Sequence, residues 1–353
     1  MDAAPAPVAD RAALDHFFSG LRAAFAEATG RLGAVERRYR LGAGAMRVAA
    51  AGAAMADTVG AAMSHIRLPD AGPATLTIRV WDDAGSGVPR LPVPWTPDAY
   101  GQKGEIAIGG DGRYAGHFQH GSETVSLFDR DAAEGFFLVP DAGRVPYWER
   151  SFPFRAILHW ATAGTTLQPV HAGAVGRAHA GVLVTGRSGS GKTTTTIACL
   201  DGGLAYAGDD YVLVDCGPEP TVYSLYDTAK FTEDSFARFP RFAGAEWNRE
   251  RVGDEKALLY GHDAFPGALI ASMPIRAIAV PRVTGLPYTT LRQVPATTAI
   301  RALAPTTLGQ LPGHGPATMA KLTRLCAAVP CIEIAAGTDL REIPVAIAAW
   351  LDR

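Results

Sequence analysis

The sequence predicts an α/β protein of two domains that meet near residue 150. Its 353 residues are enough for two domains of ordinary size. In the C-terminal part, short apolar runs alternate with segments of helical periodicity, which is typical of an α/β body. The N-terminal part instead combines one amphipathic helix with several short strands. We therefore expect an α+β domain over residues 1–150 and an α/β domain over residues 151–353.

The N-terminal domain is expected to begin with an amphipathic helix over residues 9–29. Its apolar side chains recur at helical spacing: Leu14, Phe17, Phe18, Leu21 and Phe25. Composition and alternation predict the remaining elements. They are strands at 36–41 and 75–81 with an alanine-rich helix between them, a loop at 82–112, and a hairpin of strands 114–119 and 123–129.

The C-terminal domain is expected to begin with a helix over 153–165, which has an apolar face. Two strands, PVHAGAVG (169–176) and AGVLVTG (180–186), should follow, and then a glycine-rich turn that opens a helix. The rest of this domain is expected to contain a strand ending at Asp215, strands at 276–283 and 331–334, and helices at 316–328 and 342–351.

Composition excludes some classes of partner. The formal net charge of −2 gives no basic excess, so nucleic acid is not an expected partner. The N-terminus lacks the features of a secretion signal, and the one membrane-like stretch, 41–63, contains Arg47 and Asp57. The four cysteines have no C-x-x-C spacing, which fits reduced, buried thiols: Cys199, Cys216, Cys326 and Cys331. We therefore expect a cytoplasmic protein without a transmembrane segment.

The turn GRSGSGKT, from Gly186 to Thr193, matches the phosphate-binding loop G-x-x-x-x-G-K-[ST] between a strand and a helix. Backbone N–H groups of such a loop point at phosphate, and the helix N-terminus adds a positive dipole end. We expect Lys192 to reach the β and γ phosphates and the Thr193 hydroxyl to hold Mg²⁺. The expected nucleotide contacts are Gly186, Arg187, Ser188, Gly189, Ser190, Gly191, Lys192, Thr193 and Thr194. The side chains of Thr194, Thr195 and Thr196 are expected to add nothing to the motif.

Carboxylates follow the loop at a short distance along the chain. Asp209 and Asp210 precede an apolar strand, where adjacent carboxylates are costly to bury unless a cation or hydrogen-bond donors hold them. Mg²⁺ and an acceptor hydroxyl would supply both. Asp215 ends the strand YVLVD and is a rival for the metal. We rank Asp210 first, Asp209 second and Asp215 third, and His171 in PVHAGAVG is a further candidate.

This combination of His171, GRSGSGKT and AGDD resembles HPr kinase/phosphorylase and, more distantly, phosphoenolpyruvate carboxykinase. The resemblance implies a phosphate-loop domain that transfers a phosphoryl group, with Lys192 and Thr193 holding nucleotide and metal. By this resemblance, Asp210 would be the proton acceptor and His171 would lie near the phosphates. Asp209 would support the metal or orient Asp210. The family's arginine-glycine run is missing after the aspartates, so we expect an acceptor other than HPr.

The leading hypothesis is therefore an ATP-dependent kinase that uses Mg²⁺ and phosphorylates a hydroxyl group. The acceptor could be a peptide or protein serine, or an alcohol of a small molecule or lipid. Lys230, Lys256 and Arg282 are candidate contacts to phosphate or acceptor, because a γ-phosphate in transfer needs positive charge from outside the loop. The alternative is a nucleotide switch or ATPase subunit without kinase activity. A carboxykinase acting on a keto acid is a third, weaker hypothesis.

Overall fold

The computed structural model describes residues 9–108, 112–313 and 315–353. They form two compact units, here called the first and the second unit. The first contains residues 9–61, 67–161 and 311–313, and the second contains 62–66, 162–310 and 315–353. Residues 151–161, which the sequence analysis assigned to the C-terminal domain, belong to the first unit. Residues 1–8, where the sequence lacks the features of a secretion signal, lie outside the described residues, as do residues 109–111 of the expected loop.

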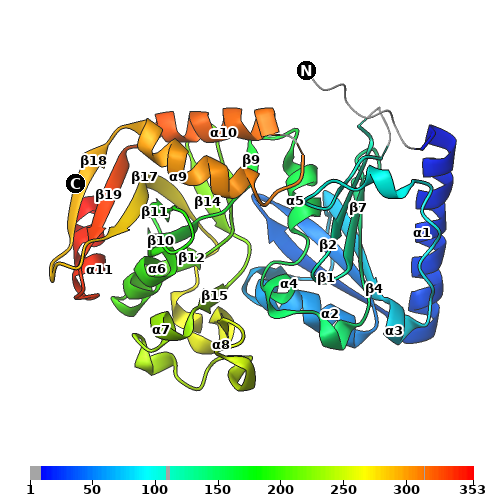
Figure 1. Ribbon diagram of the computed structural model, residues 1–353, viewed down its shortest axis with the longest axis horizontal. Helices are drawn as coiled ribbons and strands as arrows, with labels where there is room; N and C mark the ends of the chain where they lie inside the picture. The colour runs from blue at the N-terminus through cyan, green and yellow to red at the C-terminus, as the bar shows by residue number, and fades with distance from the viewer. Residues whose placement is uncertain (1–8, 109–111, 314) are drawn as a thin grey trace. The chain divides into compact units, whose positions relative to one another are not determined.

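The first unit is a mixed eight-stranded sheet with the long helix α1 (Arg11–Leu32) packed on it (Figure 1). Asp10 caps this helix by accepting a hydrogen bond from the Ala13 N–H at 2.7 Å. The helix buries Phe18, whose ring stacks on Tyr114 with centroids 4.1 Å apart. The helix predicted over 9–29 is therefore confirmed. In sheet order the strands are β3 (Arg67–Leu68), β1 (Ala34–Leu41), β2 (Gly44–Ala51), β4 (Leu76–Asp82), β8 (Glu134–Val139), β7 (Thr124–Asp129), β6 (Tyr114–Gln119) and β5 (Glu105–Ile106).

The alanine-rich helix predicted between the first two strands is only partly correct. Its first half is strand β2, which pairs with β1 along its whole length. The part from Ala53 to Gly60, α2, is an α-helix, and a 3-10 helix over Ala61–Ile66 follows it. Gly42 makes the tight β1–β2 turn with a φ of +61°. Strand pairing thus overrides the helical preference of alanine. The predicted hairpin at 114–129 is confirmed as β6 and β7. Short helices complete this part: α3 (Asp83–Ser86), α4 (Tyr147–Ser151) and α5 (Arg155–Thr162).

The second unit is a mixed nine-stranded sheet with helices on both faces (Figure 1). Helices α6 (Lys192–Asp201) and α11 (Glu342–Leu351) share one apolar core with the sheet. Helices α9 (Ala296–Leu308) and α10 (Gly315–Ala328) share the other. The sheet contains β12 (Ala205–Gly208), β10 (Gly173–Arg177), β11 (Ala180–Val184), β17 (Ser272–Val283), β14 (Thr221–Ser224), β13 (Val212–Asp215), β9 (Leu167–Val170), β18 (Thr290–Val294) and β19 (Cys331–Ala336). The predicted α/β class is thus confirmed.

A separate two-stranded ribbon lies in the second unit. It pairs β15 (Thr228–Phe231) with β16 (Ala257–Tyr260) in antiparallel register. The short helices α7 (Glu233–Phe236) and α8 (Gly261–Ala264) follow these two strands. Across the described ranges of both units, every helix is too short or too polar to cross a membrane.

Candidate active site

Strand direction brings three segments of the second unit to one edge of the sheet. The order β12–β10–β11 is antiparallel at both pairings, so the ends of β11 and β12 meet the beginning of β10. Gly173 lies opposite Val184, and Ala174 lies opposite Gly208. The segments that adjoin these four residues are His171, the glycine-rich loop, and Asp209 with Asp210. Sequence positions spread over 40 residues therefore converge at one edge.

Glycine is required where these segments approach one another. A Cβ on Gly173 would lie 2.5 Å from Thr196 Cγ2 and 2.8 Å from the Asp209 carbonyl oxygen. In the loop, a Cβ on Gly186 would lie 2.4 Å from Ser190 Oγ. Gly191 caps α6 with a φ of +96°, a conformation that side chains rarely adopt. The loop therefore curls tightly into the first turn of α6, as a phosphate cradle requires.

The lysine of the loop is folded back over it. Lys192 is buried, and its ammonium donates to the Gly186 carbonyl at 2.9 Å, with the Arg187 carbonyl 3.5 Å away. The ammonium is thus held by the first two carbonyls of the loop. Arg187, Ser188 and Gly189 form the exposed tip of this loop.

Asp209 is tied to α6 by two threonine hydroxyls. Thr193 Oγ1 donates to Oδ2 at 2.8 Å, and Thr196 Oγ1 donates to Oδ1 at 2.7 Å. The expectation that Thr196 adds nothing is therefore wrong. Thr193 and Thr196 are three positions apart and share one face of the helix. Burial, followed by the nearby charge of Asp210, raises the pKa of Asp209 to about 7 although both hydroxyls favour its ionised form.

Asp210 contacts two positively charged or proton-donating groups. Its Oδ1 lies 3.3 Å from His171 Nε2, and its Oδ2 lies 3.2 Å from Lys230 Nζ. Burial disfavours the ionised carboxylate, but Lys230, His171 and Lys192 outweigh that effect. They hold the pKa of Asp210 well below its usual range. The two adjacent aspartates thus differ strongly, because Asp209 faces hydroxyls and Asp210 faces cations.

His171 does not lie within a strand as predicted. The run PVHAGAVG divides into β9 and β10, and His171 lies between them. The division occurs because β9 pairs with β13, whereas β10 pairs with β11 and β12. Burial lowers the pKa of His171 more than Asp210 raises it, which favours the neutral ring. Because Nε2 faces a carboxylate, it carries the proton, and Nδ1 faces the Gln310 amide at 3.4 Å.

The remaining predicted residues lie elsewhere. Asp215 ends β13, at the opposite end of that four-residue strand from Asp210, and the strand itself spans roughly 13 Å. Its Oδ1 accepts from the Gly217 N–H at 2.9 Å. Lys256 is exposed, directly before β16. Arg282 is held by Glu333 on β19, at 3.2 Å. Of the three candidate cations, the structure thus pairs Lys230 with an aspartate of the cluster.

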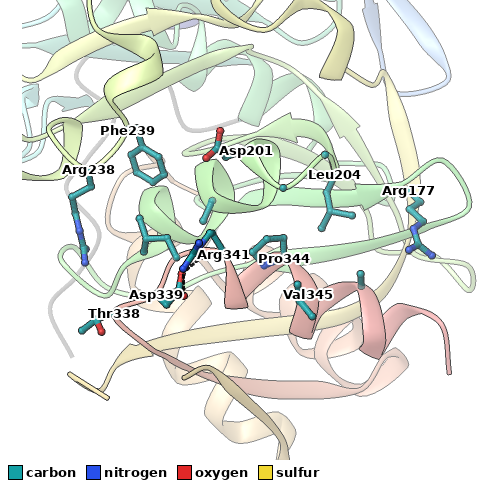
Figure 2. A pocket seen from close by; sticks show the side chains of 15 residues that line it. Arg177, Asp201, Leu204, Arg238, Phe239, Thr338, Asp339, Arg341, Pro344 and Val345 are labelled. Carbon is teal, nitrogen blue, oxygen red and sulfur yellow. Dashed lines mark hydrogen bonds and ion pairs between the residues drawn. The ribbon is translucent and has the colours of Figure 1, made fainter. Parts of the chain in front are cut away.

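A cavity of about 700 Å³ lies at the opposite end of α6, where that helix ends at Asp201 (Figure 2). Its lining on α6 begins at Ala198, six residues and therefore about 9 Å along the helix axis from Lys192. Two arginines that line the cavity form ion pairs with nearby aspartates. Arg341 pairs with Asp339 at 2.8 Å, and Arg177 pairs with Asp352. This cavity is therefore separate from the cluster at the sheet edge.

Sequence reasoning missed Gln310 and Tyr211 beside His171. Tyr211 is buried, its ring centroid lies 5.3 Å from that of His171, and its hydroxyl donates to Gln310 Oε1. Gln310 follows α9, far along the chain, and no motif marks it. The spacing of Thr196 from Thr193 was visible, in contrast, and could have predicted its contact with Asp209.

Comparison with known proteins gives little further information. No family model matches the sequence, and no curated protein matches it. A solved structure with detectable similarity is the Hpr(Ser) kinase/phosphatase from Coxiella burnetii, at 11% sequence identity and a TM-score of 0.30. The matched region covers 52% of this chain and 94% of that chain. This similarity is distant, so the function proposed below depends on the side chains at the sheet edge.

Proposed function

We propose that the second unit is an ATP-dependent kinase that transfers the γ-phosphoryl group to a hydroxyl acceptor. One observation carries the proposal. A phosphate-loop motif, a carboxylate bound to its threonine, and a second carboxylate paired with a lysine and a histidine meet at one sheet edge. Phosphoryl transfer needs a phosphate cradle, a metal site, positive charge beside the transferred group and a proton acceptor.

The loop residues fit a nucleotide phosphate chain. Gly189 and Gly191 adopt left-handed conformations, so the backbone can turn its N–H groups inward. The N-terminus of α6 adds its dipole. In this proposal the ammonium of Lys192 exchanges its carbonyl partners for phosphate oxygens, which bind it more strongly because they are charged. Arg187, Ser188 and Thr194 contribute backbone N–H groups around the phosphates, and Ser190 does so by exchanging the Arg187 carbonyl, at 3.1 Å, for a phosphate oxygen.

Thr193 and Asp209 fit Mg²⁺ because both present hard oxygen ligands and lie 2.8 Å apart. The buried thiols suit that ion poorly and play no part. When bound, the metal would neutralise phosphate charge. Asp209 is held by Thr193 and Thr196 in the orientation that this role requires. Since the thiols are free and buried, we place the reaction in the reducing cytoplasm.

Asp210 is assigned as the proton acceptor for the attacking hydroxyl. As the acceptor oxygen bonds to the γ-phosphorus and ADP leaves, the hydroxyl proton passes to Asp210. Asp210 is a weak base as long as Lys230 and Lys192 stabilise its ionised form and so keep its pKa low. Phosphate oxygens compete for Lys192 and Lys230, so bound ATP raises the basicity of Asp210 and places Lys230 beside the transferred group. His171 donates to Asp210 and fixes its orientation.

The test uses purified protein, ATP labelled at the γ position, Mg²⁺ and three acceptor classes: serine peptides, small alcohols and lipid alcohols. The kinase assignment requires label on one class with the wild type and a loss of about 10²-fold or more with Asp210→Asn. Asp215→Asn, at the far end of β13, is the matched control and should retain turnover. Phosphate release or nucleotide binding without a labelled acceptor would instead support the switch or ATPase alternative.

A further inference from the structure

A second polar cluster lies in the second unit, outside the residues assigned above. It consists of Asp227, His65, His262 and Ser224, and is called here the Asp227 cluster. The Asp227 carboxylate is fully buried, and its Oδ2 accepts from His262 Nδ1 at 2.7 Å and from the His262 backbone N–H at 2.9 Å. His65 Nδ1 lies 3.9 Å from the same oxygen, and His65 Nε2 lies 2.6 Å from Ser224 Oγ.

The backbone of Asp227 is fixed as firmly as its side chain. Its N–H donates to the Ala62 carbonyl at 3.0 Å, and its carbonyl accepts from the Gly261 N–H at 3.0 Å. Gly261 leaves no space for a side chain, because a Cβ there would lie 2.7 Å from the Asp227 carbonyl oxygen. Three segments distant in sequence are therefore held at one residue.

This arrangement costs stability if its only role is packing. A buried carboxylate must be compensated by donors, and replacing buried ionic groups with apolar ones of similar volume is often neutral or stabilising. Compensation is also incomplete, since Asp227 Oδ1 and His65 Nδ1 are buried without a hydrogen-bond partner in the described parts of the chain. What the cluster does supply is a defined position for the backbone at residue 227.

Strand β15 begins at the next residue and carries that position to the sheet edge. Thr228 pairs with Tyr260, and its carbonyl accepts from the Tyr206 hydroxyl at 2.8 Å. Two residues later, Lys230 pairs with Leu258 and places its ammonium 3.2 Å from Asp210. A shift at Asp227 therefore moves Lys230 relative to the carboxylate that it contacts.

We propose that Asp227, His262 and His65 are positioning residues that fix the start of β15 and so hold the Lys230 ammonium at Asp210 in register for phosphoryl transfer. The inference rests on the proposed kinase function for its catalytic consequence. Within the described residues, the hydrogen bonds of the cluster reach none of those assigned to nucleotide, metal or acceptor proton, so its effect on catalysis is expected to pass through Lys230.

The first test is independent of turnover. Lysine acetylation by a small reagent, followed by mass spectrometry, compares Lys230 with the exposed Lys256 of the same ribbon as internal reference. Asp227→Asn and His262→Gln should raise the Lys230 to Lys256 labelling ratio about threefold or more, since local opening exposes the ammonium. His179→Gln, an exposed histidine in the same unit, should leave the ratio at the wild-type value. An unchanged ratio in a folded His262→Gln protein overturns the proposal.

The second test is a double-mutant cycle on kcat. Asp227→Asn or His262→Gln alone should lower kcat by about tenfold or more, because small misplacements of a catalytic group cost that much. In a Lys230→Gln background the same changes should have less than a twofold effect on kcat, and in either background they should leave the nucleotide Kd of that background unchanged. Equal losses in both backgrounds indicate general destabilisation and refute a positioning role. If Asp227→Asn and His262→Gln raise the labelling ratio but the wild-type protein transfers no phosphate, only the kinase assignment is refuted.

Discussion

Replacing Thr196 by valine should destabilise the second unit, because the hydroxyl of Thr196 is one of two that hold the buried Asp209 carboxylate. Valine keeps the shape but removes the 2.7 Å hydrogen bond to Oδ1. Above the Asp209 pKa of about 7, where the carboxylate is ionised, a hydrogen bond to it contributes about 1.5–3 kcal/mol, and the buried oxygen would lose its donor. For a unit of this size, that loss corresponds to a fall in Tm of roughly 3–10 °C.

Thermal denaturation of three variants measures this effect. Thr196→Ser keeps the hydroxyl and should remain close to the wild type. Thr194→Val makes the same chemical change two positions earlier on α6, at a half-buried site, and should also have little effect. A free energy of unfolding for Thr196→Val within about 0.5 kcal/mol of that of both controls, the range of an ordinary surface substitution, would contradict a stabilising role for this hydroxyl.

Three further predictions concern the loop, the metal and pH. Lys192→Ala should reduce turnover more than tenfold, since transition-state charge stabilisation of this type contributes several kcal/mol; a folded variant that keeps more than a tenth of wild-type activity in the labelled-ATP assay contradicts the assignment. Chelation by EDTA should abolish turnover and Mg²⁺ should restore it, whereas activity unaffected by EDTA argues against a metal at Thr193 and Asp209. The hydrogen bond that His262 donates to Asp227 raises the pKa of His262, which also faces Asp263 at 3.7 Å and shares Asp227 with His65. Protonated His262 therefore contributes its full stabilisation of the fold below its ordinary pKa of about 6.5, and that contribution is lost as pH rises through the raised pKa. The Tm of His262→Gln should accordingly fall further below that of the wild type at pH 6 than at pH 9.

Local motifs account for what could be predicted of the site. The spacing from Gly186 to Thr193 fixes the loop because its chemistry depends on neighbours in sequence, and the paired aspartates are recognisable for the same reason. Lys230 could not be preferred over Lys256 from the sequence, because only the β15–β16 register directs Lys230 to Asp210. The role of His65 could not be predicted, because its partner Ser224 is 159 residues away in the sequence.

In the fold, too, local elements were predictable and those decided by distant strand pairing were not. The helix α1 and the hairpin β6–β7 were predictable from periodicity over a few turns. The β2 strand was not, because alanine carries little strand preference and its pairing with β1 decides its conformation. The run around His171 was predicted as one strand because every residue in it suits a strand, whereas its two halves pair with different neighbours.

Residues 62–66 have a consequence for synthesis of the chain. They belong to the second unit although the chain around them builds the first, and Ala62 and His65 bind Asp227 and Ser224. A ribosome adds roughly 5–20 residues per second, so about 8–30 s separate the emergence of this segment from that of β15. During that interval Ala62 and His65 lack these partners, and the segment that carries them contains Met63 and Ile66, which are buried in the folded protein. The nascent chain thus carries a short apolar stretch that a chaperone could bind until the second unit is complete, and a fragment beginning at residue 162 would never acquire it.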